Sequence, residues 1–150
     1  MYLSAEDYMK SIKDLKDSIE NKRRQLEILD EQIYITGISY DVERIKTSPK
    51  KDKLEQQVIE NVMKRDELRA KIEDDVTEML ERQETAVNII NMIDNKDQRD
   101  VLMLRYIEDK SWSDILEIRG CDDIRNQYRL HQRALDSIQK IINSHSIATT

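Results

Sequence analysis

The sequence predicts an all-α protein: a long amino-terminal antiparallel helical hairpin, coiled-coil-like, followed by a carboxy-terminal helix-turn-helix. The chain of 150 residues contains only two glycines and one proline, so few residues are suited to the turns of a sheet. Aliphatic residues recur at steps of three and four through two long segments, which is the spacing of one helix face. Residues 97–138 then read as two short amphipathic helices, a turn and a longer helix with arginines on its outer face.

A first long helix is predicted to begin at Ser4, where Asp7 follows at the spacing of a helix start. Its apolar stripe has one polar interruption at Lys22 and consists of Tyr8, Ile12, Leu15, Ile19, Leu26, Leu29 and Ile33. Thr36 and Gly37 are predicted to end this helix. Residues 38–49 combine turn formers with apolar side chains, and we interpret them as a connecting loop with room for one helical turn.

A second long helix is predicted from just after Pro49 to a break at Asp94 and Asn95. Its stripe is interrupted by Arg65 and Gln83 and consists of Leu54, Val58, Val62, Leu68, Ile72, Val76, Met79, Ala86, Ile90 and Ile93. Two amphipathic helices joined by a compact connection pair most simply as an antiparallel hairpin. Because one partner helix does not fully bury such long, narrow stripes, we expect a homodimer or a higher homo-oligomer. A spacer or generic coiled coil is the alternative for this half of the chain.

The helix-turn-helix is predicted to start with a short helix over Asp97–Ile107, followed by a polar turn at Glu108–Lys110. Either Ser111 or Ser113 is suited to cap the next helix. The buried face of that helix is expected to consist of Trp112, Ile115, Leu116 and Ile118. Arg119–Cys121, with its central glycine, is predicted to form the turn of the motif.

The last helix is predicted over Asp123–Ile141, with Asp122 or Asp123 accepting hydrogen bonds from its free N–H groups. Its inward face is expected to consist of Ile124, Leu130, Ala134, Leu135, Ile138 and Ile141. Gln127 occupies a slot where an apolar residue is expected, so it needs a hydrogen-bond partner if it is buried. The predicted regions are therefore a hairpin over 1–95, a helix-turn-helix domain over 96–143 and a flexible tail over 144–150.

The distribution of charge favours the carboxy-terminal region as a nucleic-acid binder, although the net charge of the chain is −6. Residues 1–95 hold 16 Lys and Arg against 22 Asp and Glu, whereas residues 96–150 hold nine of each kind. Within 124–141, four basic residues stand against one acidic residue. Positive charge is thus concentrated where a DNA reader needs it, but the field is modest and binding by a monomer is expected to be weak.

Seven residues of the last helix are predicted to bind DNA: Arg125, Asn126, Tyr128, Arg129, Gln132, Arg133 and Lys140. Arginine pairs bidentately with guanine, and Asn or Gln pairs with adenine, so the residues near the amino end of the helix suit base reading. Arg133 and Lys140 lie further along and suit phosphates, whereas Tyr128 suits either partner. The alternative is a three-helix bundle that binds only protein, with the arginines as an ordinary solvated face.

Three pieces of this region resemble small phage transcription regulators of the RinA and ArpU type, whose helix-turn-helix is similar to region 4 of bacterial sigma factors. They are Leu104-Arg105-Tyr106-Ile107, Trp112-x-x-Ile115 and Arg129-Leu130-His131-x-Arg133-Ala134-Leu135. The amino-terminal helices and Thr47–Pro49 resemble the family less closely, and Leu116 and Gln127 depart from its usual small and apolar residues. The resemblance implies a phage or prophage regulator of late or packaging genes, with a motif that also allows contact with RNA polymerase.

Catalytic, metal and membrane functions are not indicated. His131 and His145 are too far apart in sequence for a local metal pair, and no Gly-rich phosphate loop is present, so we expect no enzyme, cofactor or metal. No run of residues is long and apolar enough for a membrane span, and the start of the chain lacks a signal-peptide pattern. The lone Cys121 fits the reducing cytoplasm of a bacterial host.

A regulator that binds double-stranded DNA is therefore the function that the sequence favours. Two alternatives are a DNA-packaging subunit resembling a small terminase, and a coiled-coil adaptor that binds a partner protein.

Overall fold

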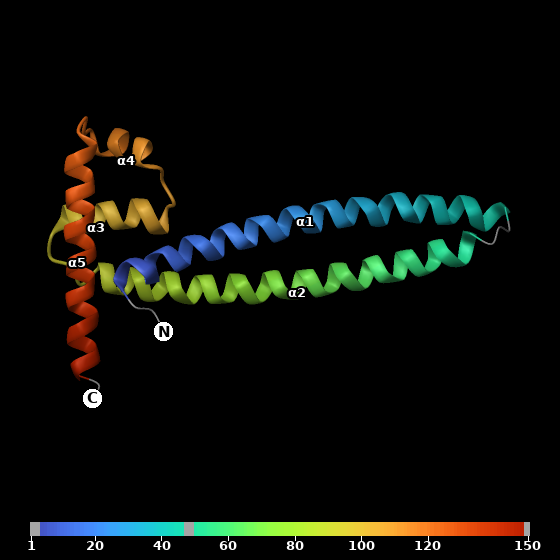
Figure 1. The fold of residues 1–150 in the computed structure, drawn as a ribbon, viewed down its shortest axis with the longest axis horizontal. Helices are drawn as coiled ribbons and strands as arrows, with labels where there is room; N and C mark the ends of the chain where they lie inside the picture. Colours follow the sequence, from blue (N-terminus) through green and yellow to red (C-terminus); the bar gives the residue numbers. More distant parts are fainter. Residues whose placement is uncertain (1–3, 47–49, 149–150) are drawn as a thin grey trace. The chain divides into compact units, whose positions relative to one another are not determined.

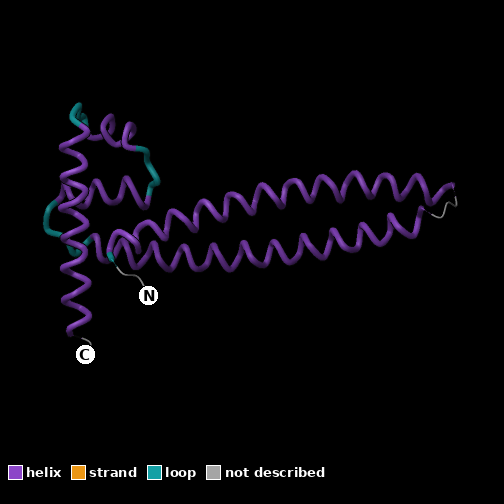
Figure 2. The backbone as a smooth tube through the Cα atoms, viewed as in Figure 1, coloured by secondary structure: helices purple, strands orange, loops and turns teal. Residues whose placement is uncertain are grey.

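The computed structural model describes residues 4–46 and 50–148 as a succession of helices without a strand in those ranges (Figures 1 and 2). The elements are α1 (Ala5–Lys46), α2 (Lys50–Ile90), α3 (Lys96–Leu102), the π-helical turn η1 (Met103–Ile107), α4 (Trp112–Arg119) and α5 (Ile124–Ala148). The predicted all-α fold is confirmed. The short helix expected over Asp97–Ile107 is present as two pieces, because its second half is wound as a π-helix.

Two predicted helix ends are wrong. α1 does not end at Thr36 and Gly37 but continues to Lys46. The Thr36 hydroxyl donates to the carbonyl of Gln32 at 2.7 Å and the Ser39 hydroxyl to that of Ile35 at 3.2 Å, so these polar side chains are satisfied within the helix. One glycine in a helix costs only about 1 kcal/mol, which a long helix tolerates.

α5 likewise continues to Ala148, where a flexible tail was expected from residue 144. Residues 149–150, and residues 47–49 of the predicted connecting loop, lie outside the described residues.

The chain divides into two compact units, residues 1–15 with 78–150 and residues 16–77. The division falls within both long helices rather than between residues 95 and 96, where the sequence analysis places the domain boundary. The first turns of α1 therefore belong to the same unit as α3, α4 and α5.

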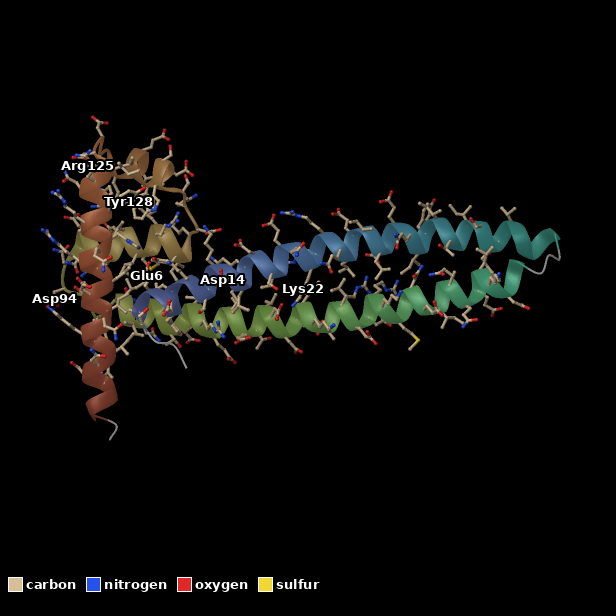
Figure 3. The ribbon with its side chains drawn as sticks, viewed as in Figure 1. Glu6, Asp14, Lys22, Asp94, Arg125 and Tyr128 are labelled. Carbon is tan, nitrogen blue, oxygen red and sulfur yellow. The ribbon has the colours of Figure 1, made fainter. Side chains whose placement is uncertain are left out.

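In the unit of residues 16–77, α1 and α2 run side by side in opposite directions, which confirms the predicted hairpin (Figure 2). Ile19 and Ile72 are buried in its seam. Lys22, the polar interruption of the first stripe, lies on α1 (Figure 3) and forms an ion pair with Asp75 of α2. Asp75 also accepts a hydrogen bond from the Ser18 hydroxyl at 3.5 Å. The interruption is thus a cross-helix contact that favours one register of the pair.

The unit of residues 1–15 and 78–150 has one hydrophobic core, to which the start of α1, the end of α2, and α3, η1, α4 and α5 contribute. Its buried members are Ala5, Met9, Ile12, Ala86, Ile90, Ile93, Val101, Leu102, Tyr106, Ile115, Ala134, Leu135 and Ile138. The prediction of an inward face is confirmed for the three core residues of α5. Burial of this shared core fixes the position of α5 relative to α3 and α4.

Two isoleucines predicted to be inward are exposed instead. Ile118 is 56% exposed, because the neighbouring Arg119 takes the place between α3 and α5. Ile124 is 37% exposed; it is the first residue of α5 and precedes the first buried position of that helix, Gln127.

Candidate nucleic-acid interface

A tight turn joins α4 to α5 and is built by local capping. The Ser111 hydroxyl accepts a hydrogen bond from the Asp114 N–H at 3.2 Å and so caps α4, which selects Ser111 from the two predicted candidates. Gly120 ends α4 in the left-handed region at φ 63°, a conformation that favours glycine. The Asp123 carboxylate then accepts from the Arg125 N–H at 2.9 Å, as predicted for the start of α5. The sequence thus encodes each step of the turn locally.

The seven residues predicted to bind DNA are all exposed on α5. Arg125, Arg129 and Arg133 follow one another at steps of four, so they lie along one side of the helix. Figure 3 shows Arg125 and Tyr128 on the first turns of α5. None of the three arginines forms an ion pair within residues 4–46 and 50–148, so their guanidinium groups are available to an external partner.

The other predicted DNA-binding residues differ in their position along α5 and in their hydrogen-bond partners. Asn126 shares the exposed first turn of α5, whereas the Gln132 amide is 3.4 Å from the Asp136 carboxylate, to which it donates. Lys140 lies almost two turns beyond Arg133, a rise of roughly 10 Å. The structure therefore brings the base-reading candidates together near the turn and leaves Lys140 apart from them.

Arg119 connects the three helices of the motif. Its Nε donates to the side-chain oxygen of buried Gln127 at 3.0 Å, and its terminal nitrogens lie 3.1 Å from the Asp97 carboxylate and 3.6 Å from that of Asp100. The predicted need of Gln127 for a partner is thus met. This role of Arg119 was not predicted, because no local sequence pattern shows that the end of α4 lies against α3.

An aromatic cluster lies beside the DNA-binding candidates. Tyr128 meets Trp112 edge to face, with ring centroids 4.9 Å apart, and Trp112 meets His131 in the same way at 5.1 Å. The Tyr106 hydroxyl is hydrogen-bonded to His131 Nε2 at 2.7 Å. The Arg105 guanidinium lies over the Trp112 ring, 5.2 Å from its centroid. Tyr128 therefore has two environments, solvent on one side and the cluster on the other.

Burial keeps the polar pair of this cluster neutral near pH 7. Burial lowers the pKa of His131, against an opposing effect of Glu6, and burial raises the pKa of Tyr106 to about 12. The imidazole of His131 and the phenol of Tyr106 are both uncharged, so their hydrogen bond is buried without burial of a charge.

The stability of the protein is expected to decline as the pH falls below about 6.5, because His131 binds a proton less readily in the folded chain than in the unfolded chain. Above that pH the free energy of unfolding owes nothing to protonation of His131. It decreases as the pH falls from 6.5 toward the pKa of His131 in the folded chain. Urea unfolding between about pH 5 and 7 would measure this slope. His131→Gln should flatten it, and the matched variant His145→Gln should retain it; an unchanged slope in His131→Gln would contradict the expectation.

Other kinds of site are not evident in the part of the chain that the structure describes. It contains no cluster of three His, Cys, Asp or Glu side chains placed to hold a metal ion. None of its helices has the length and apolar character needed to cross a bilayer.

Comparisons of the chain with protein-family models, with curated proteins and with solved structures found no match. Function is therefore inferred from the residues and their geometry.

Proposed function

We propose that the protein binds double-stranded DNA sequence-specifically through the exposed face of α5. It would act in the cytoplasm of a bacterial host as a phage- or prophage-type regulator of late or packaging genes. The single observation that carries this function is the group Arg125, Asn126 and Arg129. These side chains are exposed at the amino end of a helix that follows a short helix and a tight turn, which is where such motifs read bases.

The chemistry of this face matches the major groove. The major groove is about 12 Å wide and admits one α-helix, and Arg125 and Arg129 carry the planar pairs of donors that fit the guanine edge. Asn126 supplies the donor and acceptor that adenine requires. Arg133 and Lys140 are exposed further along α5 and would contact phosphates beside the groove, which adds affinity without sequence preference.

Homo-oligomerisation through residues 16–77 is the second part of this proposal. Ile28, Ile35 and Val42 recur at steps of seven on α1, and they are 56%, 56% and 45% exposed. Ile38 extends the same stripe, and Ile59 and Met63 of α2 are also exposed. A heptad stripe left open to solvent is typical of a seam that a second copy covers. Linking two DNA-binding domains of weak individual affinity in this way raises their combined affinity for paired half-sites.

Ile35→Lys is expected to raise the dissociation constant of the oligomer by more than about tenfold, because a charge replaces a buried apolar contact in each copy. Sedimentation equilibrium over a range of protein concentrations would measure the change. Asp41→Lys is the matched control, since Asp41 lies outside the stripe, about 100° around the helix from Val42 and about 60° from Ile38. Equal association of Ile35→Lys and the unaltered protein would exclude this seam.

Selection from a pool of random duplexes would test the proposed function directly. A DNA-reading regulator should enrich one motif, repeated with two-fold symmetry if the protein is a dimer, and bind it much more tightly than a scrambled duplex at the same salt concentration. Equal affinity for every duplex would reject sequence-specific reading. A ring of many copies on the DNA would instead indicate a packaging subunit.

A further inference from the structure

A cleft of about 520 Å³ opens in the unit of residues 1–15 and 78–150, beside the aromatic cluster. Its volume lies within the range of small-molecule sites. The start of α1, the π-helical turn η1, α4 and α5 all contribute lining residues, among them Lys13, Arg105, Trp112, Tyr128, His131 and Gln132. Most of these residues have no part in the proposed reading of duplex DNA.

The π-helical turn η1 is the first sign that this cleft is more than a gap between helices. π-helices are rare and occur frequently at functional sites. Here the turn supplies two consecutive lining residues, Arg105 and Tyr106. The wider turn is closed by hydrogen bonds from the Glu108 N–H to the Met103 carbonyl at 2.9 Å and from the Lys110 N–H to the Leu104 carbonyl at 2.8 Å.

Aromatic rings form one side of the cleft. Tyr128 is 46% exposed, and the planes of Tyr128 and Trp112 stand at 90° to each other. Edge-to-face packing holds both rings in place, so a planar guest meets rigid aromatic surface. His131 and Tyr106 lie beside them as a neutral, hydrogen-bonded pair.

Charged residues line the rest of the cleft, three basic and two acidic. Glu6 forms an ion pair with Lys10 at 3.0 Å, which neutralises one residue of each sign. Lys13 and Arg105 then stand against Asp14, so the cleft has an excess of positive charge. The Gln132 side chain adds an amide that can donate and accept at a polar ring edge.

We propose that this cleft binds a nucleotide, with the base against Trp112 and Tyr128, the base edge at Gln132 and the phosphate at Lys13 and Arg105. Aromatic faces combined with cations are the chemistry by which proteins hold unstacked nucleotides. The nucleotide is either a free effector or one residue of a single strand. The cleft shares Tyr128 and Gln132 with the candidates for binding duplex DNA, whereas Lys13, Arg105 and Trp112 belong to the cleft alone.

Trp112 gives a direct readout, since it is the single tryptophan of the chain and lines the cleft. The full-length protein would be titrated with each nucleoside monophosphate and with a short single strand, and the tryptophan fluorescence followed. Saturable quenching by a free nucleotide identifies an effector site, and quenching by the strand alone identifies a strand site. If neither the free nucleotides nor the single strand quenches the tryptophan fluorescence saturably, the proposal is overturned.

Two variants test whether the bound nucleotide occupies the cleft as described. Tyr128→Leu should weaken nucleotide binding by about tenfold or more through loss of stacking. Lys13 is half-buried in the cleft and is not part of the hydrophobic core. Lys13→Gln should therefore weaken the binding of phosphorylated probes and leave the binding of the corresponding nucleoside unchanged. Lys64→Gln, in the unit of residues 16–77, is the matched control. Unchanged affinity in both cleft variants would overturn the proposal, whatever the result for duplex DNA.

Discussion

Replacing Arg125 and Arg129 together by alanine is expected to remove the preference of the protein for its target duplex over a scrambled duplex. Each bidentate pair of an arginine with guanine contributes about 1–3 kcal/mol of discrimination, so the double change is expected to lose about 2–6 kcal/mol. Both side chains are exposed and make no ion pair in the described part of the chain, so the fold of the variant should be intact. Fluorescence anisotropy with both duplexes would measure the loss.

Arg133→Ala is the matched control for this pair, because it removes the same side chain one turn further along the same face of α5. As a phosphate contact, Arg133 should contribute equally to every duplex. Its loss should weaken all of them alike and reduce the slope of log affinity against log salt by about 1. A double variant that retains the preference, or an Arg133→Ala variant that loses it, would mean that these arginines do not read bases from this helix.

Hydrophobic periodicity was sufficient to predict the helices and the hairpin, because the apolar stripes follow directly from which helix face is buried. It was not sufficient where a residue's role depends on a distant partner. Lys22 interrupts the first stripe, and only the approach of Asp75 from α2 shows why the chain tolerates a charge there. Thr36 and Gly37 have the composition of a helix end, yet the hydroxyl of Thr36 bonds within α1 and the helix continues.

The candidate site shows the same division between local and distant information. The exposed position of Arg125, Asn126 and Arg129 at the start of α5 was predictable, because they follow a recognisable turn within a few residues. The cleft was not predictable, because Lys13 and Trp112 are far apart in the sequence and line one cleft only because the core of the unit packs their helices together. The packing of α1 against the helix-turn-helix, rather than any motif, creates the proposed nucleotide site.

Arg119→Met is expected to lower the free energy of unfolding by about 2 kcal/mol. The exchange keeps much of the apolar stem of the side chain but removes the donor to the Gln127 side-chain oxygen. Gln127 is 5% exposed, and a buried acceptor without a partner costs about 1–3 kcal/mol. The ion pairs to Asp97 and Asp100 add little, since these carboxylate side chains are 67% and 45% exposed. Urea unfolding of the variant and the unaltered protein would measure the difference.

A double-mutant cycle separates this hydrogen bond from general loss of packing. Gln127→Leu combined with Arg119→Met removes both partners, and an apolar pair of similar shape should recover most of the stability lost in Arg119→Met alone. If the two losses simply added, Arg119 and Gln127 would not be coupled, and the 3.0 Å contact would not hold α4 against α5. If α5 binds DNA as proposed, Arg119→Met should also bind the target duplex less tightly than the unaltered protein under conditions in which both are folded. The reason is that the same contact holds α5, which carries Arg125 and Arg129, against α4.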